Sequence, residues 1–466
     1  MTNMTPGTIA GLISRAKAAM KDFSGASQQQ LDEAVTALAW SLYKPETAKS
    51  LAEQAVEITG LGNVDSKITK NQRKTFGTLR DLLRVKSTGI IEEIPEKGLV
   101  KYAKPVGVVA AVTPSTNPSA TPVNKAMMAV KGGNAIIIAP SPLAWPVTNA
   151  TVEAMRAELK KVGAPEDLVQ ILPDPVTREA TNELMGAADL VVVTGSQNNV
   201  RNAYSSGKPA IGVGAGNVPV IIDASADLDD AAEKICASKT FDNSTSCSSE
   251  NSVIILNEIY DDAIAALTRA GGYLATNEEG KRIVDMLWQE GKLNRNIIAK
   301  DAPVLAETFQ LSGDAGSAKF FMVEETGIGP DHPLSDEKLS LVLTVYRAKD
   351  FADAKRIGTE ILDHVGKGHS IGIHTEDMDH ARELAEDLET VRVLVNQAHT
   401  FGNGGGFNNG LPFTLSMGCG TWQGNSISDN LNYTCFLNIT HLVTTIPEDM
   451  PAEEDLFGPH WEKYGK

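Results

Sequence analysis

A cysteine flanked by small hydroxylated residues is the part of this chain best suited to chemistry. Cys247 lies in a serine- and threonine-rich run at 244–249, and an apolar, strand-like segment follows at 253–256. Small neighbours leave a thiol sterically open, and a turn that leads into a strand can hold it rigidly, as a nucleophile requires. A buried cysteine that only fills space would have similar neighbours. Partners elsewhere in the chain must decide between the two interpretations.

The elements that must position such a thiol alternate along the chain from residue 100 onward. Apolar runs at 106–112, 135–139, 169–172, 190–193 and 218–222 alternate with helical patterns near 121–131, 145–162, 177–186 and 196–207. Apolar runs this short, spaced by helices, are typical of a parallel sheet covered on both faces. We therefore expect a doubly wound α/β domain, with a second α/β unit after it that holds Cys247.

Three parts of the chain are expected. Residues 1–226 should form a cofactor-binding domain whose first elements are a helical layer, with a capping box at Ser27 and Gln30 opening its second helix. Residues 227–424 should form the catalytic domain. Residues 425–466 should form a C-terminal return and oligomerisation segment, because 432–445 alternates in the manner of an edge strand.

Polar and glycine-rich loops follow the strands of the expected sheet, where ligands of doubly wound folds bind. Asn117 lies in a proline-bordered loop, and its amide suits a developing oxyanion, although Asn before Pro commonly serves an Asx-turn. Gly195-Ser196 opens a helix that could bind a phosphate or could be an ordinary N-cap. No GxGxxG fingerprint is present, but a glycine-rich turn at 212–216 directly precedes a strand.

Composition excludes several classes of partner. The chain has 466 residues, a formal net charge of −17 and a sequence pI near 5.0, which argues against nucleic acid and anionic membranes as partners. Four cysteines and eight histidines show no metal-binding spacing, so no metal site is expected. A reduced, cytoplasmic setting fits this cysteine usage, and no secretory or membrane-spanning segment is expected.

The chain resembles the aldehyde dehydrogenase superfamily over nearly its whole length. The resemblance rests on the order of four segments: the Asn117 loop, the helix start at Gly195-Ser196, the glycine turn at 212–216 and the Cys247 segment. Segments 334–340, 366–370 and 418–426 are further matches to its CoA-acylating branch. The resemblance implies Cys247 as nucleophile, Asn117 as oxyanion donor, NAD or NADP as cofactor and coenzyme A as co-substrate. It implies cofactor contacts at Thr113, Ser115, Ser141, Pro142, Gly195, Ser196, Gly214 and Glu337, with Glu337 binding the nicotinamide ribose. A lysine that many hydrolytic relatives carry near Ser141 is absent, which leaves the choice between NAD and NADP open.

One departure from hydrolytic members of the superfamily bears on the acceptor. Those members carry a glutamate at the start of the glycine turn, where it activates water, whereas 211–217 contains no carboxylate here. A thiol acceptor, coenzyme A, is then the expected way to release the acyl group. His369 helps to deprotonate that thiol or else bonds a backbone carbonyl, and we assign no catalytic role to Glu250.

Substrate and assembly remain open at this point. Several segments look most similar to enzymes acting on sulfoacetaldehyde, while acetaldehyde, propanal and succinate semialdehyde enzymes share the scaffold. A hydrolytic dehydrogenase is the enzymatic alternative, and a catalytically silent scaffold protein is the non-enzymatic one. Retention of Cys247, Asn117 and Glu337 together argues against the silent protein. A homodimer or homotetramer is expected.

Overall fold

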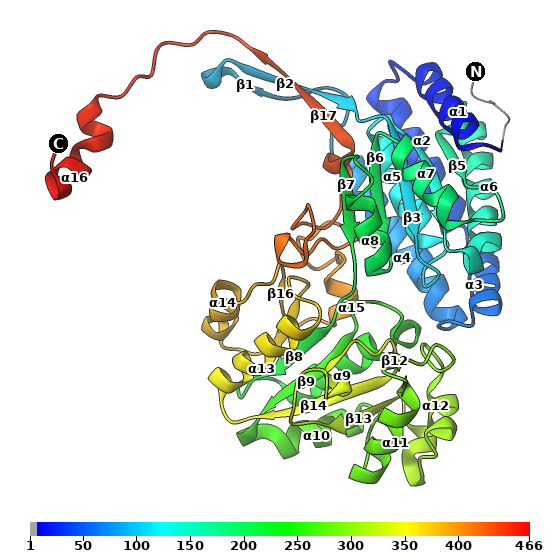
Figure 1. Cartoon of the computed structure of the whole chain (residues 1–466), viewed down its shortest axis with the longest axis vertical. Coiled ribbons are helices and arrows are strands. Elements are labelled where there is room, and N and C mark those ends of the chain that lie inside the picture. Colours follow the sequence, from blue (N-terminus) through cyan, green and yellow to red (C-terminus); the bar gives the residue numbers. More distant parts are fainter. Residues whose placement is uncertain (1–6) are drawn as a thin grey trace.

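Two parallel sheets form the body of the molecule in the computed structural model, which describes residues 7–466 (Figure 1). The first sheet has five strands in the order β5-β4-β3-β6-β7. Their bounds are Val169–Ile171, Ala135–Pro140, Val108–Thr113, Leu190–Thr194 and Ala210–Val213. All four pairings between neighbours are parallel. Crossover helices connect the strands, because parallel neighbours cannot be joined by a tight turn.

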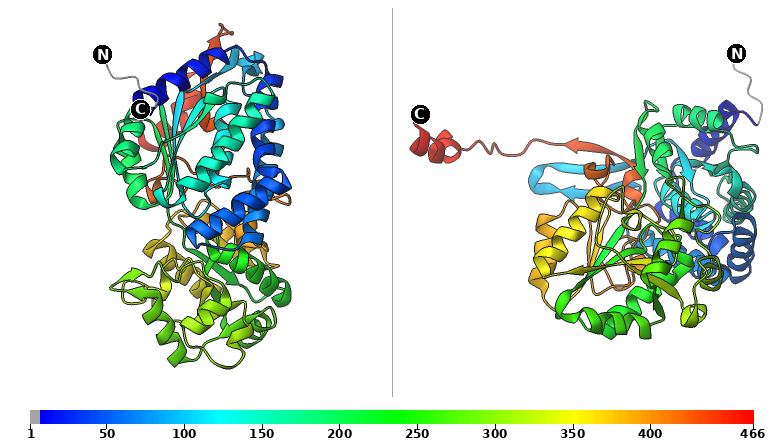
Figure 2. Two further views of the ribbon diagram at one scale, coloured as in Figure 1. Left: turned by 90° about the vertical axis from the view of Figure 1, so that its right-hand side faces the viewer. Right: turned by 60° about the horizontal axis from the view of Figure 1, so that its bottom comes forward.

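Helices cover both faces of this sheet (Figure 2). On one face α5 (Ala120–Lys131) and α6 (Trp145–Lys161) pack against the strands, and on the other lie α1 (Ile9–Asp22), α7 (Arg178–Ala187) and α8 (Gln197–Tyr204). Outside α5 and α6 an added layer consists of α2 (Gln28–Tyr43), α3 (Pro45–Thr59) and α4 (Val64–Leu83). The predicted capping box at the start of α2 is confirmed, with Ser27 and Gln30 each bonding the other's backbone.

The second sheet has seven parallel strands in the order β10-β13-β14-β9-β8-β15-β16. Their bounds are Gly272–Leu274, Phe320–Glu324, Val342–Ala348, Glu250–Leu256, Val218–Ile222, Ile371–His374 and Val393–Val395. Val220 and Ile222 belong to one apolar core and Ile221 to another, so strand alternation separates two covered faces. The covering helices are α9 (Leu228–Thr240), α10 (Tyr260–Arg269), α11 (Asn277–Leu287), α13 (Phe351–His364) and α14 (Met378–Asp387). The expected fold class, two doubly wound α/β units, is confirmed.

One strand lies in a different sheet from the one expected. Val218–Ile222 is β8 and pairs with β9 and β15, so its assignment to the first sheet was wrong. The place beside β6 is taken by β7, a strand hidden in sequence because it is short and runs into the glycine turn. The turn at 214–217 therefore carries the chain from one sheet to the other. The division of the chain at residues 226 and 424 stays a prediction.

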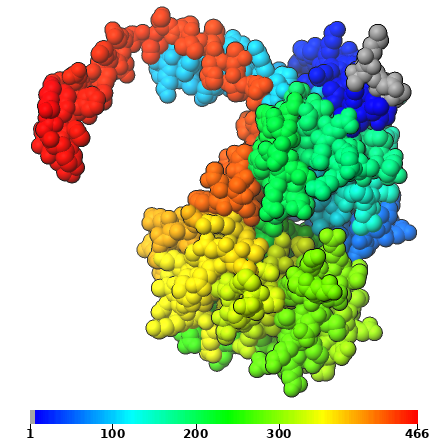
Figure 3. Space-filling model, in the orientation of Figure 1, coloured from blue at the N-terminus to red at the C-terminus, as the bar shows by residue number. Residues whose placement is uncertain are grey.

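A third, antiparallel sheet projects from the body (Figure 1). It contains β1 (Gly89–Ile94), β2 (Leu99–Pro105) and β17 (Leu437–Val443), in that order. The predicted edge strand near the C-terminus is thus β17, which pairs with β2 on one side only. Beyond it the chain continues to α16 (Glu453–Tyr464), which stands away from the body in the space-filling view (Figure 3). Within residues 7–466 no helix combines the length and apolarity that crossing a bilayer requires.

The shorter elements complete the connections. The hairpin strands β11 (Trp288–Gln289) and β12 (Lys292–Leu293) form a two-stranded antiparallel sheet, and α12 (Ala302–Thr308) follows them. The four-residue helix α15 (His399–Gly402) lies beside α9 and begins the long loop that returns toward the first sheet. This loop matters for function because its residues 400–417 face α4 across a pocket.

Candidate active site

A strained turn presents Cys247 between α9 and β9. Asp242, Asn243 and Ser244 have φ values of 51°, 52° and 64°, in the left-handed region that is costly for most side chains. Asp and Asn are the non-glycine residues that tolerate it best. The turn is held by the buried Asp242 carboxylate, whose Oδ2 accepts from Lys67 Nζ at 3.1 Å, from Lys70 Nζ at 2.5 Å and from Thr245 Oγ1 at 2.7 Å. Two lysines of α4 therefore fix the loop that carries the thiol.

The Cys247 thiol is only partly exposed and is neutral in the free protein. Burial raises its pKa to about 12, and the charges of Glu337 and Cys419 raise it further, against opposing contributions from Ser248 and Arg392. Cys236, Cys419 and Cys435 are also free thiols, and Cys247 is the one whose flanking serines line a pocket. A nucleophilic role for this residue requires a proton acceptor or an added positive charge nearby.

The glycine turn approaches Cys247 closely at Gly216. A Cβ added there would lie 2.2 Å from the Cys247 carbonyl oxygen and 2.9 Å from His369 Nε2, so no larger residue fits. Gly214, which the sequence analysis assigned to the cofactor, instead lies against the side chain of Gln197 on α8. Its cofactor contact stays a prediction. The structure thus brings together three segments that are distant in sequence: the turn, the cysteine loop and the histidine.

His369 is buried with one ring nitrogen engaged and the other free. Its Nδ1 lies 2.8 Å from Ser370 Oγ, and Ser370 Oγ lies 2.9 Å from His399 Nε2. His369 Nε2, which faces the glycine turn, has no hydrogen-bond partner among the described residues. Burial lowers the pKa of His369 well below its usual range, with Arg392 and His399 adding to the shift. The neutral ring has one nitrogen available to accept a proton.

Asn117 lines a pocket together with the two serines that flank Cys247. The pocket contains about 440 Å³ of empty space, including its opening. The Asn117 side chain has only a long contact of 3.5 Å, from Nδ2 to Thr116 Oγ1, and its buried Oδ1 has no partner within residues 7–466. No bond to the turn backbone holds the amide, as an Asx-turn would require. The amide therefore remains available to a ligand.

The other predicted cofactor contacts gather at one edge of the first sheet. Thr113, Ser141, Gly195 and Gly214 each end or directly follow one of the adjacent strands β3, β4, β6 and β7, and Ser115, Pro142 and Ser196 lie beside them. Thr113 Oγ1 is buried without a hydrogen-bond partner in the described part of the chain. Ser196 caps the start of α8, whose first N–H groups point toward this edge. A free hydroxyl and a helix N-terminus fit a nucleotide that carries phosphates.

Glu337 reaches the glycine turn from the second unit. The Gly216 backbone N–H donates to its carboxylate, and burial raises the pKa of Glu337 to about 7. Glu250 is also buried, with its pKa raised to about 7, but it begins β9 and its Oε1 accepts from the His399 backbone N–H at 3.1 Å. These contacts hold Glu250, at the start of β9, against the start of α15. The charge of Glu337, in contrast, acts on the Cys247 thiol and raises its pKa.

Several site residues escaped the sequence analysis. Arg392 donates to the backbone oxygens of His369 and Gly418, and the Ser370–His399 pair stands behind His369. Lys70, Arg73 and Lys74 line the pocket from α4. Their spacing of three and four residues places them on one helix face, which was a readable signal. Across residues 7–466 no group of three or more His, Cys, Asp or Glu side chains could hold a metal ion.

Comparison with known proteins adds independent findings. Residues 2–289 match the model of the aldehyde dehydrogenase family. Over 98% of its length the chain is 50% identical to a sulfoacetaldehyde dehydrogenase (acylating) of Cupriavidus necator, 93% of which is covered. It is 46% identical to the enzyme of that name from Bilophila wadsworthia, with 98% of each chain covered. The crystal structure of an acetylating aldehyde dehydrogenase from Geobacillus thermoglucosidasius matches with a TM-score of 0.91 at 36% identity, covering 96% of this chain and 98% of that one.

Proposed function

The chain belongs to the acylating branch of the aldehyde dehydrogenase family, and from that premise we propose that it oxidises sulfoacetaldehyde to sulfoacetyl-CoA. The overall reaction consumes the aldehyde, coenzyme A and an oxidised nicotinamide nucleotide, and it yields the acyl-CoA, the reduced nucleotide and one proton. Two electrons leave the aldehyde as hydride, so electrons and atoms balance. The substrate follows the names of the two relatives that are 50% and 46% identical to this chain.

Cys247 and Asn117 carry out the first half of the proposed reaction. The Cys247 thiol gives up its proton to solvent, the resulting thiolate attacks the aldehyde carbon, and the aldehyde oxygen becomes an oxyanion that the Asn117 amide and the Cys247 backbone N–H stabilise. The nicotinamide, when bound, supplies the hydride acceptor. As the carbonyl re-forms, the acyl group is left on Cys247 as a thioester. Asn117 suits this role because its amide has no hydrogen bond to the turn backbone in the described residues.

His369 serves the second half in this proposal. Its free Nε2 accepts the proton of the CoA thiol, and the resulting thiolate attacks the thioester carbon. Cys247 then leaves as thiolate and is regenerated, and the protonated His369 ring releases its proton to solvent, which accounts for the one proton of the overall reaction. The Ser370 hydroxyl, 2.8 Å from Nδ1, orients the ring. The lowered His369 pKa keeps the ring neutral at physiological pH, so that Nε2 is unprotonated before the thiol binds.

One observation supports a thiol rather than water as the acceptor of the acyl group. It is the close approach of Gly216, in the glycine turn, to the Cys247 carbonyl. The turn that contacts the Cys247 carbonyl contains no carboxylate, and a Cβ at Gly216 would lie 2.2 Å from that oxygen. The base that hydrolytic members of the family place in this turn is missing. The thioester should therefore persist until a thiol accepts the acyl group.

We propose that the nucleotide, NAD or NADP, lies along the edge of the first sheet. Thr113, Ser115, Ser141, Pro142, Gly195, Ser196 and Gly214 would contact it there, and Glu337 would bind its nicotinamide ribose. Residues 1–226 would then form the cofactor-binding domain and 227–424 the catalytic domain. The buried, unpartnered Thr113 hydroxyl and the N-terminus of α8 support this placement.

The test is a burst experiment with CoA withheld. Rapid mixing with sulfoacetaldehyde and each nucleotide should give reduced cofactor near one equivalent per site, followed by a slow steady rate. The quenched protein should carry an acyl adduct on the peptide containing Cys247, and CoA should restore rapid turnover. Cys247→Ala should give neither burst nor adduct.

The same experiment separates the alternatives. Free acid released at full speed without CoA would make the protein a hydrolytic dehydrogenase, with Glu250 or His369 as candidate bases. A burst with acetaldehyde, propanal or succinate semialdehyde but not with sulfoacetaldehyde would keep the acylating chemistry and reject the substrate. No burst with any aldehyde would favour a silent scaffold.

We also propose that the protein acts in the cytoplasm as a homodimer or homotetramer, with small molecules as its other partners. Four free cysteines suit a reducing compartment. The outer edge of β17 has no strand partner within residues 7–466, and Ile439, Leu442 and Val443 on it are exposed. An exposed apolar edge strand that projects from the body is suited to pairing with a second copy of the chain.

A further inference from the structure

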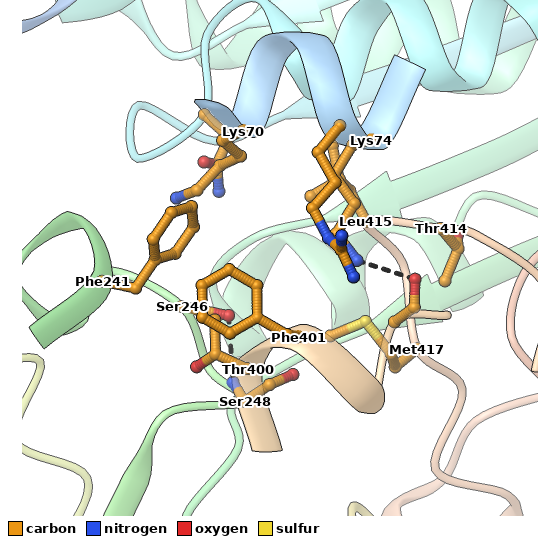
Figure 4. A pocket seen from close by; sticks show the side chains of 13 residues that line it. Lys70, Lys74, Phe241, Ser246, Ser248, Thr400, Phe401, Thr414, Leu415 and Met417 are labelled. Atoms are coloured by element: carbon orange, nitrogen blue, oxygen red, sulfur yellow. Dashed lines mark hydrogen bonds between the residues drawn. The ribbon is translucent and has the colours of Figure 1, made fainter. Parts of the chain in front are cut away.

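Helix α4 places a cluster of cations above the cysteine loop. Lys70, Arg73 and Lys74 line the pocket that Asn117 shares with the serines flanking Cys247. Figure 4 shows Lys70 beside Phe241 and Lys74 on the side of Thr414 and Met417, with Ser246, Ser248 and Thr400 on the opposite side of the pocket. A protein with a net charge of −17 thus concentrates positive charge at the site where the aldehyde is expected to react.

Only part of this charge is neutralised within the protein. Asp242 is the counter-ion of Lys67 and Lys70. Arg73 and Lys74 form no ion pair with any carboxylate of the described chain, although Lys74 Nζ donates to the Gly404 carbonyl at 2.7 Å. Burial lowers the pKa of Lys74 to about 7, with the charges of Arg73 and Lys70 adding to the shift. A bound anion would relieve this repulsion.

The guanidinium N–H groups of Arg73 have no hydrogen-bond acceptor among the described residues. No hydrogen bond joins its guanidinium to another residue in 7–466, and it lies over the rings of Phe401, Phe407 and Phe413 at 5.6, 5.0 and 6.0 Å from their centroids. Aromatic faces orient a guanidinium without consuming its hydrogen bonds. Across the pocket, Thr400 is only 6% exposed, and its Oγ1 also lacks a partner there.

We propose that Arg73, assisted by Lys74 and the Thr400 hydroxyl, binds the sulfonate of the substrate and determines the preference for a negatively charged aldehyde. This inference rests on the proposed function and identifies the residues that give it specificity. The guanidinium fork matches two oxygens of a tetrahedral anion, and a positive partner strengthens each bond. One methylene separates the sulfonate from the carbonyl carbon. A substrate bonded to Cys247 with its oxygen at Asn117 would therefore place the sulfonate among the residues that line this pocket together with Asn117.

The phosphates of the nucleotide or of CoA are the other anions to consider. The residues expected to hold the nucleotide, among them Gly195, Ser196 and Glu337, do not line this pocket. Arg73 and Lys74 instead share it with Asn117, the expected oxyanion donor. The location therefore favours the aldehyde's own anion, and a CoA phosphate becomes an outcome of the test.

The test compares two aldehydes in three variants. Arg73→Met should lower the ratio of kcat/KM for sulfoacetaldehyde to that for propanal by about 10- to 100-fold, the range expected for charged hydrogen bonds. Arg73→Lys, which keeps the charge and loses the fork, should lie between the wild type and Arg73→Met. Arg80→Met is the matched control, because Arg80 lies on the same helix and over Phe407 and Phe413 but pairs with Asp81 outside the pocket. Its ratio should equal that of the wild type.

A binding measurement without turnover complements the kinetics. Ethanesulfonate, an unreactive analogue, should slow iodoacetamide alkylation of Cys247 in the wild type and Arg80→Met, relative to chloride at equal ionic strength, but not in Arg73→Met. If Arg73→Met lowered kcat/KM equally for sulfoacetaldehyde and propanal, the proposal would be overturned. A raised KM for CoA in Arg73→Met, with an unchanged ratio of kcat/KM for the two aldehydes, would overturn it as well. Arg73-dependent protection in a wild type that does not oxidise sulfoacetaldehyde would support the anion site and reject the proposed substrate.

Discussion

At the scale of single residues, the resting state of Cys247 is set by its electrostatic surroundings. Burial and the nearby Glu337 carboxylate hold the thiol neutral, with its pKa raised to about 12. The Arg392 guanidinium opposes this shift only weakly. A free enzyme with such a thiol is protected against adventitious oxidation, because the thiolate is the reactive form. Activation must come from groups that arrive with the reactants.

Removing the Glu337 charge should therefore make the free thiol more reactive. Glu337→Gln at pH 8, above the Glu337 pKa of about 7, should lower the Cys247 pKa and speed its alkylation by iodoacetamide several-fold, up to about tenfold. Mass spectrometry of the Cys247 peptide without cofactor measures this rate. Glu383→Gln, which removes an exposed carboxylate on α14, should leave it unchanged. A slower reaction in Glu337→Gln would mean that Glu337 acts on the thiol as a base.

At the scale of elements, α4 links the first unit to the catalytic loop. Its buried Lys67 and Lys70 share the Asp242 carboxylate, and that carboxylate holds three consecutive left-handed residues in place. The ion pairs thus connect a helix near residue 70 to a turn near residue 242. Their main role is to fix the position of the loop, because buried pairs contribute modest net stability but are costly to break.

Asp242→Asn should accordingly destabilise the protein by about 3 to 5 kcal/mol, since two buried ammonium groups lose their counter-ion. Chemical denaturation followed by tryptophan fluorescence measures the loss. Asp229→Asn, which breaks the exposed pair with Arg269, should cost less than about 1 kcal/mol. A similar small effect for both variants would show that water or another group compensates the lysines.

The two ion pairs of Asp242 also predict how the stability of the protein depends on pH. The two lysines hold the Asp242 pKa below its usual range, so the carboxylate stabilises the fold fully above its unfolded pKa, near 3.9. As pH falls through the lower folded value, this contribution is lost. The stability difference between wild type and Asp242→Asn should therefore be larger at neutral pH than in strong acid, where it should shrink.

At the scale of the whole molecule, the projecting sheet leaves several apolar side chains exposed, among them Ile439, Leu442 and Val443. β17 pairs with β2 on one side, and the exposed residues continue along the tail through Met450, Leu456 and Phe457. Apolar side chains on an arm held away from the body are unfavourable in an isolated monomer. They support assembly through this arm.

Charge placed on β17 should weaken that assembly. Ile439→Lys with Val443→Lys puts two ammonium groups on one face of the strand, where Val443 is 64% exposed in the isolated chain. Sedimentation should show a smaller species than the wild type, with the circular dichroism spectrum retained. Met378→Lys, at an exposed apolar residue on α14, is the control and should sediment as wild type. An unchanged oligomer in the double variant would place the interface elsewhere.

The amino-acid sequence by itself determined most of the local structure. Short β-branched runs predicted β3, β4, β5 and β6, because strands buried on both faces are predominantly apolar. The capping box at Ser27 determined where α2 begins. The small residues around Cys247 singled it out because a nucleophile needs open surroundings. Each of these signals lies within about ten residues of chain, where local sterics and hydrogen bonding dominate.

Only the tertiary structure decided which distant residues share a site. Strand 218–222 has the same apolar pattern as its neighbours, and only its pairing with β9 and β15 assigns it to the second sheet. Gly216 lies close to the Cys247 carbonyl, and Arg73 gains its importance from phenylalanines more than 300 residues away in the chain. Periodicity reports which face of an element is buried but not which element covers it. That choice depends on long-range packing and charge pairing, which no local window of sequence contains.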